Sequence, residues 1–247
     1  MRLALMSDIH ANIQALDACL AHARARGARQ FAFLGDLVGY GGDPVAVLQQ
    51  VQLLVAQGAW LLKGNHDAMA VNPPAEVQAL GEHTAAWTHA QLDETQRRFL
   101  DQLPMTIPLP FGLLVHASAD EPHAWRYVMD QASVDASLAA AAGASHVFGG
   151  HVHVQTLYGR GGNQRLSRYT CPPGLTIPVP ASRQWLATIG SVGQPRDGNP
   201  RAMYAVFDTE RQELTFERVE YDHQAAAAAI RRAGLPTFFA DRLLQGR

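Results

Sequence analysis

The stretch Gly149-Gly150-His151-Val152-His153-Val154 places two histidines two positions apart, directly after an apolar run. Successive side chains of a strand alternate between its two faces, so an extended backbone would point His151 and His153 to the same side. Two neutral imidazoles directed at one point suit a metal ion. A polar face of an edge strand, or a loop, is the more common origin of such a pair taken alone, so the rest of the chain must decide.

Polar clusters follow four other strand-like runs: Ser7-Asp8-Ile9-His10, Gly35-Asp36-Leu37-Val38-Gly39-Tyr40, Lys63-Gly64-Asn65-His66-Asp67 and Val115-His116-Ala117. Ligands bind at the carboxyl ends of strands in open α/β sheets, so we expect these clusters to converge. Three Asp, one Asn and five of the eleven His would then share one cleft. Without a cation, bringing these side chains together would be unfavourable, because like charges repel and dehydrated carboxylates need positive partners. Two divalent ions bridged by one carboxylate would satisfy them. Oxygen and imidazole ligands without thiolates favour manganese, iron or zinc in five- or six-coordinate sites, and they argue against a thiolate-rich structural zinc site.

The elements that would position these clusters alternate in the first part of the chain. Residues 2–6, 31–34 and 60–62 read as strands, and Ile13, Leu16, Leu20 and Ala23 follow at helical spacing until Gly27. Asp43-Pro44 supplies an N-cap and a first-turn proline for a second helix. These strand-helix repeats favour a βαβ start and a partly parallel sheet.

The rest of the chain has a different pattern. A polar helical segment ends at Pro104, and short strand candidates then lie at 113–115, 146–148, 154–158, 185–188, 202–207 and 214–219. Residues 134–142 form the one helix among them, and we expect mainly antiparallel sheet. The segment from about 159 to 182, rich in Gly, Pro and Arg, predicts an arm or hairpin inserted in a single domain of residues 1–247. A C-terminal helical stretch from 222 to 245 should break near Gly234-Leu235-Pro236.

Composition limits the setting. The chain has 247 residues, of which 47% are hydrophobic and 17% charged, as expected of a globular protein. No apolar run of about 18 residues could span a membrane, and the N-terminus lacks the apolar region of a signal peptide. Cys19 and Cys171 lie far apart, so no disulfide framework is predicted. A net charge of −2 gives no general attraction to nucleic acid or to a membrane. We expect a cytoplasmic protein.

In their order and spacing, the five clusters resemble the calcineurin-like metallophosphoesterases. The matching blocks are Asp8-x-His10, Gly35-Asp36-x-x-Gly39, Gly64-Asn65-His66-Asp67, Val115-His116 and Gly150-His151-x-His153. The loop Ser191-Val192-Gly193-Gln194-Pro195-Arg196-Asp197 looks like that of the small bacterial and archaeal phosphodiesterase branch, although Thr188-Ile189 stands where that branch usually has Asn-Pro. The resemblance implies an α/β fold, a four-layer α-β-β-α sandwich of two mixed β-sheets flanked by helices.

The resemblance also implies residue roles. Asp8, His10 and His153 would hold the first metal, Asn65, His116 and His151 the second, and Asp36 would bridge the two. His151 and His153 would then serve different ions, so strand alternation would not describe them and the backbone would turn at Gly149-Gly150. His66 would stand beside the scissile phosphate, oriented by Asp67. The ions would be manganese first, with iron, zinc and nickel as alternatives, and would activate a bridging hydroxide for in-line attack.

The expected activity is hydrolysis of phosphodiester or phosphomonoester bonds in a small phosphorylated or nucleotide substrate. Alternatives are a dinucleoside polyphosphate hydrolase or a phosphoprotein phosphatase. A non-catalytic protein-binding scaffold of the same fold is disfavoured, because the ligand set and His66 are complete. Arg196 either binds a substrate phosphate or pairs with Asp197 or another surface acid. Asn12 and Tyr40 either orient ligands or form turns, and the remaining histidines are expected to be structural or on the surface.

Overall fold

The structure, a computed structural model, describes residues 1–76, 79–162 and 165–247. Its first sheet has the strand order β3-β2-β1-β11-β12-β9. The strands are β1 (Arg2–Met6), β2 (Gln30–Phe33), β3 (Trp60–Leu61), β9 (Thr176–Pro178), β11 (Ala202–Asp208) and β12 (Glu213–Val219). β1, β2 and β3 pair in parallel, whereas β11, β12 and β9 are antiparallel to their neighbours. The sheet is therefore mixed.

The second sheet has the order β4-β5-β6-β10-β7-β8. Its strands are β4 (Thr106–Leu109), β5 (Gly112–Val115), β6 (His146–Gly149), β7 (Gln155–Arg160), β8 (Leu166–Tyr169) and β10 (Gln184–Ile189). β6 pairs in parallel with both β5 and β10, and the other pairings are antiparallel. The prediction of mainly antiparallel sheet after Pro104 is thus confirmed, and β6 is an exception, because the crossover through α6 returns the chain in the direction of β5.

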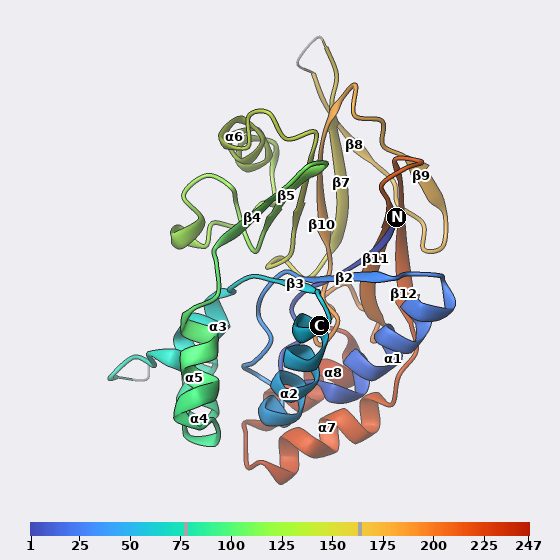
Figure 1. Cartoon of the computed structure of the whole chain (residues 1–247). Helices are drawn as coiled ribbons and strands as arrows, with labels where there is room; N and C mark the ends of the chain where they lie inside the picture. Colours follow the sequence, from blue (N-terminus) through green and yellow to red (C-terminus); the bar gives the residue numbers. More distant parts are fainter. Residues whose placement is uncertain (77–78, 163–164) are drawn as a thin grey trace.

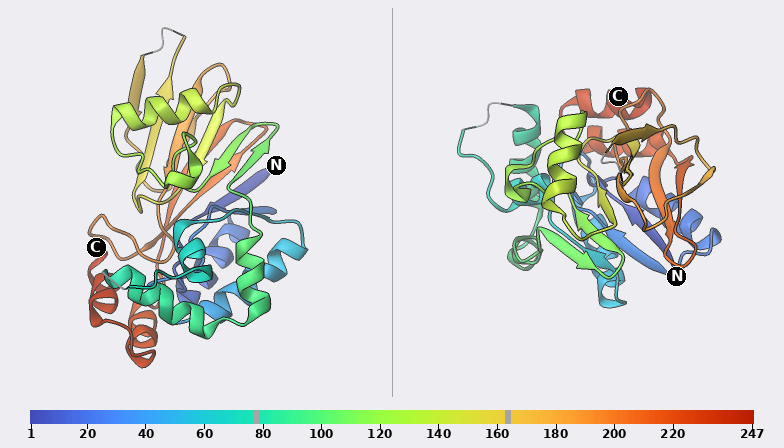
Figure 2. Two further views of the ribbon diagram at one scale, coloured as in Figure 1. Left: turned by 90° about the vertical axis from the view of Figure 1, so that its left-hand side faces the viewer. Right: turned by 90° about the horizontal axis from the view of Figure 1, so that it is seen from above.

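Helices cover the outer faces of both sheets (Figures 1 and 2). α1 (Ile13–Ala25) and α2 (Pro44–Ala56) pack on the first sheet, and α6 (Gln131–Ala140) packs on the second. α3 (Asn65–Val71), α4 (Leu80–Gln91) and α5 (Glu94–Asp101) form a group beside the sandwich, and α7 (His223–Arg232) and α8 (Thr237–Gln245) lie near α1. A short 3₁₀ turn spans Pro122–Ala124. The predicted four-layer sandwich is confirmed.

Strand β1 shows how the sequence builds these layers. Leu3 and Leu5 lie in the core between the two sheets, and Ala4 and Met6 lie in the core under α1 and α2. Every residue from Leu3 to Met6 is therefore buried, and the strand is a continuous apolar run, as is usual for a strand covered on both faces. This burial fixes the position of the polar residues that follow β1.

Some local predictions need correction. The polar segment before Pro104 forms three helices, because α3 begins at Asn65 itself and Asp93 caps a separate α5. Asp43 lies at the start of α2 but its side chain caps no backbone amide, and it instead accepts a hydrogen bond from Gln14. The predicted arm at 159–182 supplies β8 to the second sheet and β9 to the first, because each finds an open edge strand to pair with. Residues 163 and 164 of this segment lie outside the described residues. The C-terminal break after α7 is confirmed.

Candidate metal centre

The polar clusters follow β1, β2, β3, β5 and β6, and their side chains meet where the carboxyl ends of these strands come together. The seven side chains singled out as metal ligands are thus brought into one place. They lie in two groups that share one carboxylate.

The first group consists of Asp8, His10 and His153. The Nε2 atoms of His10 and His153 lie 3.1 Å apart, and Asp8 Oδ1 lies 3.2 Å from His153 Nε2. The other ring nitrogens face backbone carbonyls, since His10 Nδ1 lies 3.2 Å from Val38 O and His153 Nδ1 lies 2.6 Å from Gln194 O. These carbonyls hold the proton on Nδ1 and leave both Nε2 lone pairs directed at the centre of the group.

The second group consists of Asn65, His116 and His151. His116 Nε2 lies 3.1 Å from Asn65 Oδ1 and 3.2 Å from His151 Nδ1. Leu34 O lies 2.7 Å from His116 Nδ1 and fixes that ring in the same way. The backbone amide of His151 donates to Asp8 Oδ2 at 2.9 Å, which ties the second group to the first.

Asp36 lies between the groups. Its Oδ2 atom is 3.4 Å from His116 Nε2 and 3.7 Å from His10 Nε2, and its Oδ1 accepts a hydrogen bond from the His66 amide at 2.8 Å. Asp36 can therefore contribute to both groups, as a bridging carboxylate does.

Electrostatics indicate that these groups suit cations. All seven side chains except Asn65 are buried. Neutral imidazoles whose lone pairs face each other at about 3 Å repel, and buried carboxylates need positive partners. His151 Nε2 is buried without any hydrogen-bond partner. Divalent cations would satisfy the oxygen and imidazole donors, so the residues fit the ions that the sequence predicts.

The protein without ions compensates through shifted pKa values. Burial alone would raise the pKa of Asp8 and of Asp36, but His153 and His116 respectively lower each below the ordinary range. Burial and His153 lower the pKa of His10, and burial and His116 lower that of His151 to about 4. Burial would lower the pKa of His116, but Asp36 overrides it and raises the value to about 9. Asp36 and His116 therefore favour opposite charges at neutral pH.

The backbone of the site is unusual. Five ligand candidates adopt left-handed φ values between 50° and 67°: Asp8, His10, Asp36, His151 and His153. Such conformations cost non-glycine residues about 1–3 kcal/mol each and gather at functional sites. Gly150 is required beside them, because a Cβ there would overlap Ser7 and the Asp8 carboxylate. β6 ends at Gly149, so His151 and His153 lie in a loop and face different groups, as the resemblance implies and strand alternation does not.

Comparison with known proteins identifies the family. Residues 1–212 match the sequence model of the calcineurin-like phosphoesterase superfamily domain. The chain belongs to this superfamily. An uncharacterised protein of Methanocaldococcus jannaschii is 30% identical over 251 residues, which cover 99% of this chain and 98% of that protein. The crystal structure of a metallophosphoesterase from Sphaerobacter thermophilus is 31% identical with a TM-score of 0.88, covering 100% of this chain and 99% of that one. A hypothetical protein from Pyrococcus horikoshii OT3, at 20% identity and a TM-score of 0.80 over 100% and 98% of the two chains, has the same fold.

Membership of the calcineurin-like phosphoesterase superfamily supports a metal-dependent phosphoesterase, a hydrolase that uses divalent ions. The groups around Asp8, Asp36 and His116 are the candidate ligand sets in this chain. No helix in the described ranges is long and apolar enough to cross a bilayer.

His66 borders the first group. Its ring lies 5.0 Å from the His10 ring and 4.2 Å from the Tyr40 ring, measured between centroids. Burial lowers the pKa of His66 to about 4, so the ring is neutral at pH 7 until an anion approaches. Its Nδ1 atom is buried and has no hydrogen-bond partner. The ring itself lies beside the first ligand group, next to the place where a substrate would bind.

The expected contact between Asp67 and the His66 ring is absent. The Asp67 carboxylate instead accepts hydrogen bonds from the backbone amides of Asp36, Leu37, Val38 and Gly64. Burial and the charge of Asp36 raise the pKa of Asp67 to about 7, although these amides oppose the rise. The i+1 spacing on α3 turns the two side chains apart, so Asp67 positions His66 only through the backbone.

Other predicted residues have clear contacts. Arg196 does not pair with Asp197, because that carboxylate contacts Arg218. The guanidinium of Arg196 lies 6.0 Å from the Tyr40 ring, and its Nε atom is buried without a partner. Asn12 caps α1 by accepting from Ala15 N, and it also donates to Gly193 O, so it joins two loops of the site. The Tyr40 ring lies against the rings of both His10 and His66, tilted with respect to each. His146 contacts Phe111 O and Val179 O and is structural, as expected.

The sequence reasoning missed two aromatic residues. The Tyr127 ring stacks on the His151 ring with centroids 4.1 Å apart, and the Trp125 ring meets the His116 ring edge-on at 5.8 Å. Neither lies in a periodic pattern, so the only signal available was their position shortly after the His116 cluster.

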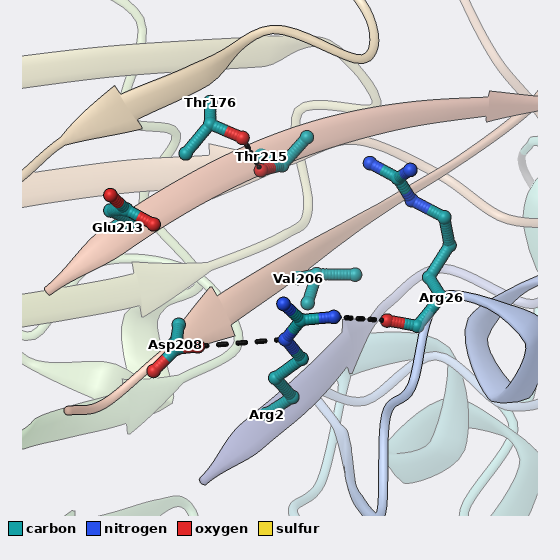
Figure 3. A pocket seen from close by; sticks show the side chains of 7 residues that line it. All are labelled: Arg2, Arg26, Thr176, Val206, Asp208, Glu213 and Thr215. Carbon is teal, nitrogen blue, oxygen red and sulfur yellow. Dashed lines mark hydrogen bonds and ion pairs between the residues drawn. The ribbon is translucent and has the colours of Figure 1, made fainter. Parts of the chain in front are cut away.

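A separate polar pocket of about 130 Å³ lies on the first sheet, where Arg2 and Arg26 approach Asp208 and Thr176 (Figure 3). Its arginines are already partnered. Arg2 contacts Asp208 and the Arg26 carbonyl, and Arg26 Nε lies 2.8 Å from Glu217 Oε1. None of the ligand candidates lines this pocket, so the chemistry belongs to the two groups at the strand ends.

Proposed function

We propose that the protein hydrolyses phosphodiester bonds, and to a lesser extent phosphomonoesters, at a binuclear metal centre. The observation that carries the proposal is the position of Asp36, whose carboxylate oxygen lies within 3.7 Å of ring nitrogens from both groups. A carboxylate shared by two ligand sets is what a pair of ions about 4 Å apart requires.

Asp8, His10 and His153 would hold one ion, Asn65, His116 and His151 the other, and Asp36 both. Manganese is the proposed metal, because the donors are oxygen and imidazole and no cysteine lies among them. When bound, such ions supply an activated water and neutralise charge on phosphate oxygens.

The protein groups around the ions would handle the substrate. His66 is the proposed catalytic residue, because its ring lies beside the first ligand group, where the charge of a phosphate oxygen would favour the protonated ring. Arg196 is the proposed second cation for the substrate, because its Nε atom has no partner. Asp67 would act on the reaction only by holding the backbone of the loop that carries Asp36.

The setting is proposed from the sequence. A cytoplasmic location agrees with two free cysteines, of which Cys19 is buried and Cys171 half-buried. The substrate is proposed to be a small phosphorylated molecule or nucleotide, without a membrane or nucleic-acid partner.

A substrate panel tests the proposal. The protein is purified with EDTA, supplied with Mn²⁺ and assayed on bis-p-nitrophenyl phosphate, p-nitrophenyl phosphate, a diadenosine polyphosphate and a phosphopeptide. We expect metal-dependent hydrolysis, fastest on the diester and lost in the matched control His66→Ala. If no compound is hydrolysed with any divalent metal, the protein is not the proposed phosphoesterase.

A further inference from the structure

An open groove of about 540 Å³ lies directly beside the second ligand group. Asn65 and His151 belong to both the group and the groove wall, so the groove continues from the candidate metal centre without a barrier. Its other walls are formed by α3, through Met69 and Asn72 among others, and by Trp125 and Tyr127. A substrate phosphate held at the metal centre would therefore direct one of its organic groups into this groove.

Two aromatic rings are fixed at the groove. Tyr127 stacks on His151 with an interplanar angle of 20°, and 51% of Tyr127 is exposed, so the other face of its ring is open. Trp125 is half-buried and has a left-handed φ of 51°, which is rare for a bulky residue. A strained backbone that persists next to a functional site is commonly held there to place a side chain.

The segment that carries these rings is held by the residue between them and by the residue that follows them. Val128 is buried in the core beneath α6, and Arg126 pairs with Asp120 and Glu121. The rings are therefore presented by a braced segment and lose little freedom when a ligand binds.

The chemistry of the walls selects the ligand. Among the described residues, none that lines this groove carries a permanent charge, and the amides of Asn65 and Asn72 offer both donors and acceptors. A phosphate or a charged peptide side chain would find no partner in it, whereas a neutral planar ring would stack and form hydrogen bonds through its edge. Arg196 stands apart, beside Tyr40, where an anionic group would go.

We infer that this groove binds the nucleobase of a nucleotide substrate, which makes Trp125 and Tyr127 specificity-determining residues. A base stacked on the open face of Tyr127 would be separated from the His151 ring by the whole Tyr127 ring. An aryl group bonded directly to the phosphate oxygen would not reach that far from the metal centre. The sugar of a nucleotide supplies that spacer. The inference rests on the proposed function, because the metal centre must hold the phosphate.

Binding of two uncleavable analogues tests the inference. They are the methylene phosphonates of adenosine 5′-phosphate and of ribose 5-phosphate, which differ only in the base, and calorimetry gives their affinities for the Mn²⁺-loaded protein. We expect the analogue with the base to bind wild type about tenfold more tightly or better, since stacking of one base on an aromatic ring is worth about that much.

The variant Tyr127→Ala should lose most of this preference, because the base is expected to stack on the open face of this ring. Met129→Ala is the matched control, because Met129 is exposed in the same segment and does not line the groove, and this variant should keep the preference. Equal affinities in wild type, or an unchanged preference in a folded Tyr127→Ala, would overturn the inference. Tighter binding of a phosphonate analogue of phosphotyrosine would overturn it too, in favour of a directly attached ring.

The wild-type comparison does not depend on how any variant folds. Failure of the proposed function is seen separately, as absence of hydrolysis across the substrate panel. Hydrolysis without a preference for the base would reject only the nucleobase site.

Discussion

The shared carboxylate of Asp36 leads to a prediction about how many metal ions each variant keeps. The His153 ring contacts the first group and the His151 ring contacts the second, whereas Asp36 lies within 3.7 Å of ring nitrogens from both. His153→Ala and His151→Ala should each retain one Mn²⁺ ion, and Asp36→Asn should bind both ions weakly. Wild type should bind two.

The size of the effect follows from linkage. At a free metal concentration of one hundred times the dissociation constant, each ion that binds only the folded protein adds about 2.7 kcal/mol to the free energy of unfolding. For a chain of this length, 1 kcal/mol shifts the melting temperature by roughly 2–4 °C. Wild type should therefore gain about 11–22 °C from two ions, and each histidine variant about half of that. Asp36→Asn should gain little.

Metal analysis after dialysis and melting curves with Mn²⁺ or with EDTA measure these quantities. His22→Ala is the control, because His22 contacts the Tyr204 hydroxyl away from the site and should lower the starting stability without changing the gain from metal. A full gain in Asp36→Asn would refute the shared carboxylate. A second ion retained in both histidine variants would refute the assignment of ligands to two separate sets.

Four further predictions concern single properties. His66→Ala should keep both ions and lose about 10²- to 10⁴-fold in kcat, as measured by hydrolysis and metal content; unchanged turnover would reject its role. Asp67→Asn should lower the free energy of unfolding in urea by about 2–4 kcal/mol, because an amide nitrogen would replace one oxygen that accepts from two backbone amides. Arg196→Ala should raise KM for the phosphoester about tenfold, whereas the exposed Arg201→Ala should not. Because the pKa of His116 is raised from 6.5 to about 9, its charge stabilises the metal-free protein below pH 6.5. That stability should be lost as the pH rises from 6.5 to 9, and Mn²⁺ should bind more tightly over the same range as the proton leaves His116. Melting temperature and Mn²⁺ affinity measured against pH test both trends, and a missing or reversed trend would contradict the prediction.

The grouping of the ligand candidates could be predicted because it depends on topology. Asp8 and Asp36 follow apolar parallel strands of the first sheet and His116 follows an apolar strand of the second, and polar residues at the carboxyl ends of such strands are expected to converge. Which ring faces which group depends on backbone angles that the sequence does not reveal. His151 and His153 differ in their partners because both adopt left-handed φ values after β6 ends, and a strand model would have placed them together.

Contacts between segments far apart in the chain were beyond prediction. Asp67 satisfies the backbone amides of Asp36, Leu37 and Val38 some 30 residues away, and no local pattern distinguishes this from an interaction with the adjacent His66. Trp125 and Tyr127 stand out only because they contact the rings of His116 and His151, and tertiary folding brings these rings together. Sequence motifs therefore locate residues that bind ions more readily than residues that select the substrate.

The C-terminal segment also makes contacts near the candidate site that the sequence motifs do not predict. The match to the superfamily ends at residue 212, yet residues beyond it complete the wall next to His66. Phe239 of α8 stacks on Tyr40 with centroids 4.8 Å apart, and Tyr40 in turn lies against His10 and His66. Because Tyr40 is held between α8 and the ligand groups, any change in the packing of α8 would reach His66 through one ring. Residues beyond the range matched by the superfamily model are thus placed to affect the candidate site.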